Sequence, residues 1–155
     1  MSGEPPKFVT MICDASHCPY TNATGWAVWI KHGSPAKTER LSGSTRTKDS
    51  TKAERYALLK GSLYLIENVD LQDAIVIVQS DCRGALGKVD VGLFKQRGAR
   101  HVKLKWVRGH QGVKDPRSAV NTWCDTEAKA QMRPLRDRIY ASRIPPNIYS
   151  PKESA

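Results

Sequence analysis

Two largely apolar stretches, residues 8–13 and 74–78, dominate the hydrophobic pattern of this chain. Runs of this length are typical of strands that a sheet buries on both faces. Asp14 follows the first run directly, and Asp81 ends the strand that contains the second. A buried carboxylate is costly unless it is paired or binds a metal ion. We therefore expect the two strands to lie side by side, with both aspartates in one shared metal site.

The other predicted strands have weaker apolar patterns. Residues 25–30 predict a second strand, and residues 37–43 predict a third with the low apolar content of an edge strand. A turn that contains Gly33 and Pro35 connects these two, so the first three strands are expected to pair antiparallel. Residues 101–107 alternate apolar and basic side chains, which is typical of a half-exposed strand.

The clearest helical pattern runs over residues 51–68. Glu54, Leu58, Gly61 and Leu65 fall on one narrow face of this helix, which we expect to pack on the sheet. That packing brings Glu54 towards the ends of the strands. An alternative role for Glu54 is local, because residues 51–54 also match a helix-capping box.

Two further helices are expected in the second half of the chain. A short one covers residues 83–89, and a last one begins at the Asp115-Pro116 cap and ends near residue 133, before Pro134. The last helix carries Asp125 and Ala128 on a common side. These boundaries predict one domain over residues 1–133, followed by a basic, proline-containing and poorly ordered tail over residues 134–155.

The composition narrows the class of protein. A chain of 155 residues corresponds to one domain with a proper core. Its formal net charge of +10 favours a polyanionic partner, nucleic acid before membrane. No segment resembles a signal peptide or is apolar enough to cross a membrane, so an intracellular location is expected.

The four cysteines do not predict a disulfide framework. Cys13, Cys82 and Cys124 each adjoin an aspartate and are expected to point into the core, as in a protein from a reducing compartment. Cys13, His17 and Cys18 have the residue types of a zinc site, but the sequence offers no second pair of ligands to complete it.

The order of the acidic residues resembles that of type 1 ribonuclease H. Asp14-Ala15-Ser16 follows the first strand, Glu54 lies on a helix, and Asp81 ends the fourth strand. Gly109-His110 and Asn121-x-x-x-Asp125 then follow in the same order as in that family. The resemblance covers residues 8–131. It implies an α/β ribonuclease H-like fold, with a five-stranded mixed sheet of order 3-2-1-4-5 flanked by helices, and a monomeric protein.

The resemblance also implies the chemistry of the site. Asp14, Glu54, Asp81 and Asp125 would hold two Mg²⁺ ions, with Asp14 bridging them and with Mn²⁺ as an alternative metal. Oxygen ligands of this kind suit hard divalent cations, which relieve the repulsion among converging carboxylates. His110 would assist proton transfer or product departure. The implied reaction is two-metal-ion hydrolysis of the RNA strand of an RNA–DNA hybrid, giving 5′-phosphate and 3′-hydroxyl ends.

Candidate substrate contacts lie near the expected strand ends and helix starts, where they could meet the 2′-hydroxyls of the minor groove. They are Ser16, Tyr20, Asn22, Ser50, Thr51, Arg83 and Asn121. Ser50-Thr51 replace the asparagine that the family usually has before its helix glutamate. The segment after Asp81 is too short for the extra helix and basic protrusion of some family members. Basic residues further along would replace that charge as phosphate contacts: Lys88, Lys95, Arg97, Arg100, Lys103 and Lys105.

Two other functions remain open at this point. One is a nuclease of the same fold that cuts DNA, like a resolvase or transposase; the Ser50-Thr51 departure favours it, whereas Gly109-His110 and Asn121 disfavour it. The other is a catalytically silent module that binds nucleic acid. Four acidic residues argue against a silent module, because a cluster of mutually repelling carboxylates gives a phosphate-binding surface no advantage.

Overall fold

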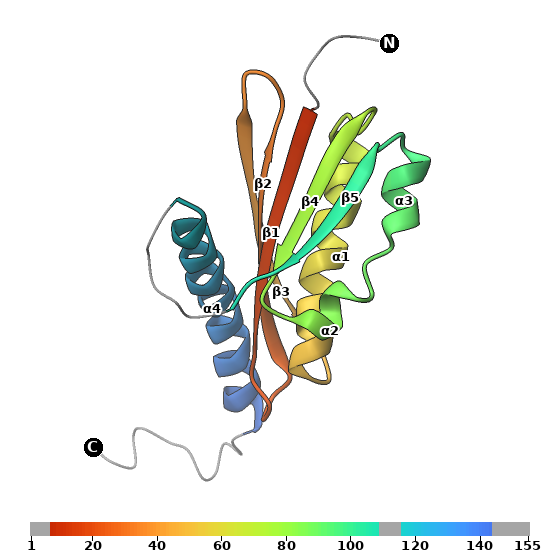
Figure 1. Cartoon of the computed structure of the whole chain (residues 1–155). Coiled ribbons are helices and arrows are strands. Elements are labelled where there is room, and N and C mark those ends of the chain that lie inside the picture. Colours follow the sequence, from red (N-terminus) through yellow and green to blue (C-terminus); the bar gives the residue numbers. More distant parts are fainter. Residues whose placement is uncertain (1–6, 109–115, 144–155) are drawn as a thin grey trace, which may run out of the picture.

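A mixed sheet with helices on both faces forms the body of the protein (Figure 1). The computed structural model describes residues 7–108 and 116–143. Within these ranges the strands are β1 (Lys7–His17), β2 (Ala23–His32), β3 (Lys37–Arg46), β4 (Ala74–Ser80) and β5 (His101–Trp106). The helices are α1 (Ser50–Asn68), α2 (Arg83–Leu86), α3 (Val91–Gln96) and α4 (Pro116–Arg143). Figure 1 shows α1, α2 and α3 on one side of the sheet and α4 on the other.

The sheet has the predicted strand order, β3-β2-β1-β4-β5. The pairs β1–β2 and β2–β3 are antiparallel, whereas β1–β4 and β4–β5 are parallel. The two strands that lead to Asp14 and Asp81 are therefore neighbours, as expected. β1 is longer than predicted: it continues past Asp14 to His17, because those last residues still pair with β2.

The larger core lies between α1 and the sheet. Val9 and Met11 of β1 and Val76 and Val78 of β4 are buried there, against Leu58 and Leu65 among others of α1. Residues two apart on a strand share a face, which explains why these alternate positions are apolar. Gly61 lets α1 approach closely, since a Cβ at this position would clash with the sulfur of Met11. The predicted inner face of α1 is confirmed.

The opposite face of the sheet is covered by α4. Ile12 of β1 and Ala27 of β2 pack there against Cys124 and Ala128 of α4. The contact is close at Gly25 of β2, where a Cβ would clash with the Ala128 carbonyl and lie 2.6 Å from the backbone nitrogen of Met132. The absence of a side chain at Gly25 therefore sets the distance between α4 and the sheet.

The prediction that Pro134 ends the last helix is wrong. α4 continues to Arg143 with Pro134 inside it, so the expected boundary after residue 133 falls within a helix, and residues 134–143 are not a poorly ordered tail. Leu135 and Ile139 pack against Cys18, Ala23 and Met132, which form a small cluster where β1 turns into β2. The remainder of the expected tail, residues 144–155, lies outside the described residues.

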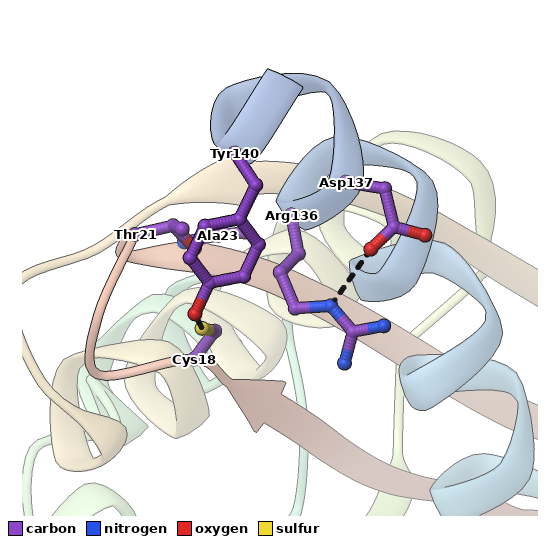
Figure 2. Close-up of polar contacts among 6 residues, drawn as sticks. All are labelled: Cys18, Thr21, Ala23, Arg136, Asp137 and Tyr140. Carbon is purple, nitrogen blue, oxygen red and sulfur yellow. Dashed lines mark hydrogen bonds and ion pairs between the residues drawn. The ribbon is translucent and has the colours of Figure 1, made fainter. Parts of the chain in front are cut away.

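Polar contacts also join the end of α4 to the β1–β2 turn. The Tyr140 hydroxyl lies 4.0 Å from the Cys18 sulfur, as Figure 2 shows, and Arg143 donates a hydrogen bond of 2.8 Å to the Tyr20 carbonyl oxygen. One helical turn before Tyr140, the partly exposed Arg136 pairs with the exposed Asp137 (Figure 2). The helical extension and the turn thus support each other.

Three smaller features complete the fold. α3 was not predicted, and the short helix α2 ends three residues before its expected end.

All four cysteines are free. The arrangement of Cys13, His17 and Cys18 does not favour a zinc site. The two cysteines belong to separate buried clusters, and the His17 Nε2 atom lies 3.0 Å from the Thr47 carbonyl oxygen. None of the helices in the described ranges is both long and apolar enough to cross a lipid bilayer.

Candidate metal centre

Asp14 lies where β1 and β4 separate. The parallel pairs between these strands end at Ile12 and Gln79, two residues before Asp14 on β1 and two before Asp81 on β4. The same register therefore places the two aspartates next to each other, just beyond the last pair. The Asp14 carboxylate accepts a hydrogen bond of 2.8 Å from the backbone N–H of Ala15, which helps to orient it.

Glu54 reaches this point from α1. It lies on the inner face of the first helical turns, and its Oε1 accepts a hydrogen bond of 3.3 Å from the same Ala15 N–H. The alternative role in a capping box is wrong, because Asp49 caps α1 with a bond of 2.8 Å from the backbone N–H of Lys52. Glu54 therefore does not cap the helix, and its side chain contacts the sheet at Ala15.

Asp14, Glu54 and Asp81 form one carboxylate cluster. Each offers an oxygen, and these three oxygens all lie within 4.8 Å of one another. Burial and the Asp81 charge raise the pKa of Asp14 from 3.8 to about 7. Burial and the charges of Asp14 and Asp81 raise the pKa of Glu54 to about 11. Without a cation, the cluster therefore holds protons at neutral pH.

Asp125 lies close to this cluster without belonging to it. Its charge contributes to the raised pKa of Asp14, so the two carboxylates interact. In the structure its carboxylate pairs with Lys129, four residues along α4, at 3.1 Å. Of the four predicted acidic ligands, three are brought together and the fourth is held beside them by an ion pair.

The cluster has the chemistry of a site for a hard divalent cation. Its donors are all carboxylate oxygens, the ligands that Mg²⁺ and Mn²⁺ prefer. Among residues 7–108 and 116–143, the buried Glu54 Oε2 has no hydrogen-bond partner, although a buried carboxylate oxygen normally has one. A bound cation would give this oxygen a partner and would neutralise the repulsion that raises the two pKa values.

Three predicted substrate residues lie along the end of β1 and the turn that follows. Ser16 is half-buried in the strand, and Tyr20 is exposed on the turn. Asn22 has a left-handed backbone (φ 62°), and its side-chain oxygen lies 3.3 Å from His17 Nε2. Tyr20 is therefore free to contact a ligand, whereas the Asn22 side chain already has a role in ordering the turn.

Three others lie at the starts of the two helices that flank the cluster. Ser50 and Thr51 are exposed in the first turn of α1, one helical turn before Glu54. Arg83 begins α2, and its guanidinium lies over the ring of Trp106, 3.9 Å from the ring centroid. In the sequence, all three lie within a few residues of Glu54 or Asp81.

Asn121 has a structural partner that the sequence analysis missed. Its side-chain oxygen accepts a hydrogen bond of 2.9 Å from Gln79, which is completely buried at the end of β4. This bond ties α4 to β4 one turn before Asp125. The signal in the sequence was Gln79 itself, a single amide at the end of an apolar strand and on the same face as Asp81. His110 lies outside the described residues.

A basic groove was also missed. It has a volume of about 550 Å³ and lies between α1, the turn before it and the segment that holds α2 and α3. Five cations and one acidic residue line it: Arg46, Lys48, Lys52, Arg55 and Lys88, with Asp90. Only Lys88 belonged to the predicted set of basic residues. The helical spacing of Lys52, Arg55 and Leu59 on the outer face of α1 could have indicated the groove.

Comparison with known proteins agrees with this architecture. No family model matches the sequence, and no curated protein matches it either. Solved structures do match. The N-terminal RNase H domain of a Mycobacterium tuberculosis protein has a TM-score of 0.60 at 16% identity, over 89% of this chain and 99% of that domain.

Two further structures are similar to the same extent. LC11-RNase H1, solved in complex with an RNA/DNA hybrid, has a TM-score of 0.60 at 13% identity, over 82% of this chain and 98% of its own. LC9-RNase H1, described as a type 1 RNase H with the type 2 active-site motif, has a TM-score of 0.58 at 18% identity, over 84% and 76%. Together with the strand order, these matches show that the chain has the fold of type 1 ribonuclease H.

Proposed function

We propose that this protein is a metal-dependent endoribonuclease that hydrolyses the RNA strand of RNA–DNA hybrids and leaves 5′-phosphate and 3′-hydroxyl ends. The observation that carries the proposal is the cluster of Asp14, Glu54 and Asp81 where β1 and β4 separate. The fold supports it, since structures of this fold include an RNase H bound to an RNA/DNA hybrid.

The residues of the cluster have distinct roles in this proposal. Asp14, Glu54 and Asp81 would hold two Mg²⁺ or Mn²⁺ ions. Asp125 would join as the fourth ligand after leaving Lys129. When bound, such ions lower the pKa of a water molecule and stabilise negative charge on phosphate oxygens. His110 is proposed to move a proton or to aid product release, which suits a group that titrates near neutral pH.

The protein would bind the hybrid through its basic groove and the residues around the cluster. Phosphate groups are attracted by Lys52 and Arg55, which lie on α1 beside Glu54 in sequence. Ser50, Thr51, Arg83 and Tyr20 would contact the sugar edge of the minor groove, together with Ser16, Asn22 and Asn121. The hydroxyls of Ser50 and Thr51 can both donate and accept, and so can replace an asparagine at that position.

The direct test uses one labelled RNA strand in three forms: paired with DNA, paired with RNA, and alone. Each form is incubated with Mg²⁺ and, separately, with EDTA. We expect cleavage of the hybrid only, with Mg²⁺ only. Cleavage of duplex or branched DNA instead would identify a DNA nuclease. No cleavage of any substrate, together with no binding of Mg²⁺ or Mn²⁺, would identify a silent nucleic-acid-binding module.

Matched variants connect the activity to the cluster. Asp14→Asn should abolish cleavage while the protein stays folded, because it removes one ligand charge and keeps the shape of the side chain. Asp137→Asn, at an exposed position on α4, is the control and should cleave like the wild type. Retention of Mg²⁺-dependent cleavage by Asp14→Asn would overturn the assignment of the site.

A second pair of variants tests the groove. Arg55→Glu should raise KM for the hybrid, with a larger effect at low salt, and should leave kcat nearly unchanged, because phosphate contacts position the substrate. Arg138→Glu makes the same charge change on an exposed part of α4 and should have little effect on KM. An equal rise in KM for both variants would show that only the total charge matters.

A further inference from the structure

Asp81 lies beyond the last paired residues of β4 and β5. The ladder between these strands ends at Ser80 and Trp106, and the backbone N–H of Val107 donates to the Ser80 carbonyl oxygen at 3.1 Å. At the next residue the donor is a side chain instead of a backbone N–H: Trp106 Nε1 donates a hydrogen bond of 3.0 Å to the Asp81 carbonyl oxygen. The indole thus holds the peptide group that carries the Asp81 side chain.

A second contact holds the indole in place. The guanidinium of Arg83, two residues after Asp81, lies 3.9 Å from the centroid of the Trp106 ring. The edge of the ring is therefore bonded to Asp81, and its face is covered by Arg83. Such cation–π contacts restrict the rotation of an aromatic side chain. Trp106 is 40% exposed, so burial in a core does not explain its position.

We propose that Trp106 is a positioning residue for Asp81, which acts through its indole N–H to keep the Asp81 carboxylate in the cluster with Asp14 and Glu54. The inference rests on the metal site of the proposed function. Holding the Asp81 carbonyl restricts the plane of the peptide that follows Asp81, and with it the direction of the Cα–Cβ bond from which the carboxylate extends. Groups that orient metal ligands in this way contribute to metal affinity without touching the metal.

The location of Asp81 explains why such a device is needed. Asp14 lies inside β1 and is paired with Ala27 of β2, and Glu54 lies inside α1, so regular structure orients both of them. Asp81 lies between the end of β4 and the start of α2. The hydrogen bond from Trp106 restrains the backbone at Asp81, as the β4–β5 ladder restrains it at Ser80.

The test measures Mn²⁺ affinity by titration calorimetry, in the absence of nucleic acid, for three proteins: the wild type, Trp106→Phe and Trp123→Phe. Trp106→Phe keeps an aromatic ring beneath Arg83 and removes the N–H donor together with part of the indole ring, a loss of size that Trp123→Phe shares. Trp123 is the matched control, because it also stacks with an arginine: the Arg40 guanidinium of β3 lies 5.0 Å from its ring centroid. Trp123 itself lies on α4 and packs against the cluster that contains Ile12 and Ala27. Urea unfolding of all three proteins checks that their stability is equal.

We expect the dissociation constant for Mn²⁺ to rise about tenfold in Trp106→Phe and to stay within about twofold of the wild type in Trp123→Phe. In a cleavage assay, raising the Mn²⁺ concentration should restore kcat in Trp106→Phe and leave KM for the hybrid unchanged. Unchanged Mn²⁺ affinity in Trp106→Phe, or an equal loss in both variants, would overturn the inference. So would a wild-type protein that binds no Mn²⁺.

Failure of the proposed function gives a different result. If none of the proteins cleaves the hybrid, but Trp106→Phe still binds Mn²⁺ more weakly than Trp123→Phe, the hybrid substrate is wrong and the role of Trp106 stands. If the hybrid is cleaved and all three proteins bind Mn²⁺ equally, the function stands and the role of Trp106 is wrong.

Discussion

In metal-free protein, Asp14→Asn is expected to increase the free energy of unfolding at pH 8. Asp14 is held against Glu54 and Asp81, and burial and the Asp81 charge raise its pKa from 3.8 to about 7. A folded-state pKa above the unfolded value means that the folded protein holds a proton that the unfolded chain has already lost. The contribution of Asp14 to stability is therefore fully present below about pH 4 and is lost as the pH rises through about 7.

The magnitude follows from the same pKa values. Each pH unit between the unfolded and folded pKa corresponds to 1.36 kcal/mol, so a change from 3.8 to about 7 costs the ionised, metal-free wild type at most about 4 kcal/mol. Water and counter-ions at the edge of the sheet reduce this cost, and we expect a net gain of roughly 1–3 kcal/mol for the variant. The asparagine keeps the oxygen that accepts the Ala15 hydrogen bond, so that bond is retained.

The assay is urea unfolding in EDTA at pH 5 and pH 8, and again with Mg²⁺. The wild type should lose stability between pH 5 and pH 8 in EDTA. Mg²⁺ should restore about 1.4 kcal/mol at a concentration ten times its dissociation constant. Asp14→Asn should show a smaller pH effect and little response to Mg²⁺. Asp137→Asn makes the same chemical change at an exposed site and should follow the wild type.

The reasoning is refuted if Asp14→Asn is no more stable than the wild type in EDTA at pH 8. That result would mean that the three carboxylates do not repel one another in the folded protein, and a metal ion would then have no repulsion to relieve. An equal gain in Asp137→Asn would instead show a general effect of net charge.

Three further predictions concern the packing of α4 and the metal. Gly25→Ala should lower the free energy of unfolding, measured in urea, by about 3 kcal/mol, because the new methyl group overlaps the backbone of α4. The control is Gly84→Ala, which should be neutral or slightly stabilising because a Cβ has room there. Ile139→Ala should cost about 1–2 kcal/mol, and Arg138→Ala on the exposed side should cost almost nothing in the same assay; equal costs would mean that the end of α4 is not packed. Mg²⁺ affinity should rise with pH through about pH 7, by about tenfold per pH unit for each proton that a bound ion displaces from Asp14 and Glu54, and calorimetry in buffers of different ionisation enthalpy would count those protons.

Much of the site was predictable because it depends on local patterns. Two apolar strands that each lead to an aspartate are visible without any structure, and parallel neighbours bring such residues to one place. The inner face of α1 was also predictable, because Leu58, Gly61 and Leu65 recur with the period of a helix. Neither inference needed to know which distant residues touch.

Glu54 shows where local patterns become ambiguous. Its position as the fifth residue of α1 fitted both a cap and a ligand, and nothing within the helix distinguishes the two. The structure decides between them, because Asp49 takes the capping bond and Glu54 meets Ala15 of β1. The contact joins residues 39 positions apart, so only the packing of α1 on the sheet could reveal it.

Pro134 marks a case in which tertiary packing outweighs a local rule. A proline inside a helix loses a backbone hydrogen bond and costs about 3 kcal/mol, which is why a helix end was expected there. Beyond it, Leu135 and Ile139 bury apolar surface against Cys18 and Ala23, and Arg143 bonds the turn. These partners are more than 100 residues away in sequence, so the benefit of continuing the helix is invisible locally.

The chain's own pattern of apolar runs and acidic residues thus specified the strands, the main helix and the two aspartates at the strand ends, because strand and helix periods act over a few residues. The complete strand order and the other two carboxylates were expected only from the resemblance to type 1 ribonuclease H. Folding decided which oxygens meet, that Asp125 pairs with Lys129, that Gln79 bonds Asn121, and that Trp106 holds Asp81. Apart from the ion pair within α4, these contacts join different elements. Their geometry depends on how closely helices and strands approach one another, and that distance is set by packing at positions such as Gly25 rather than by any local sequence pattern.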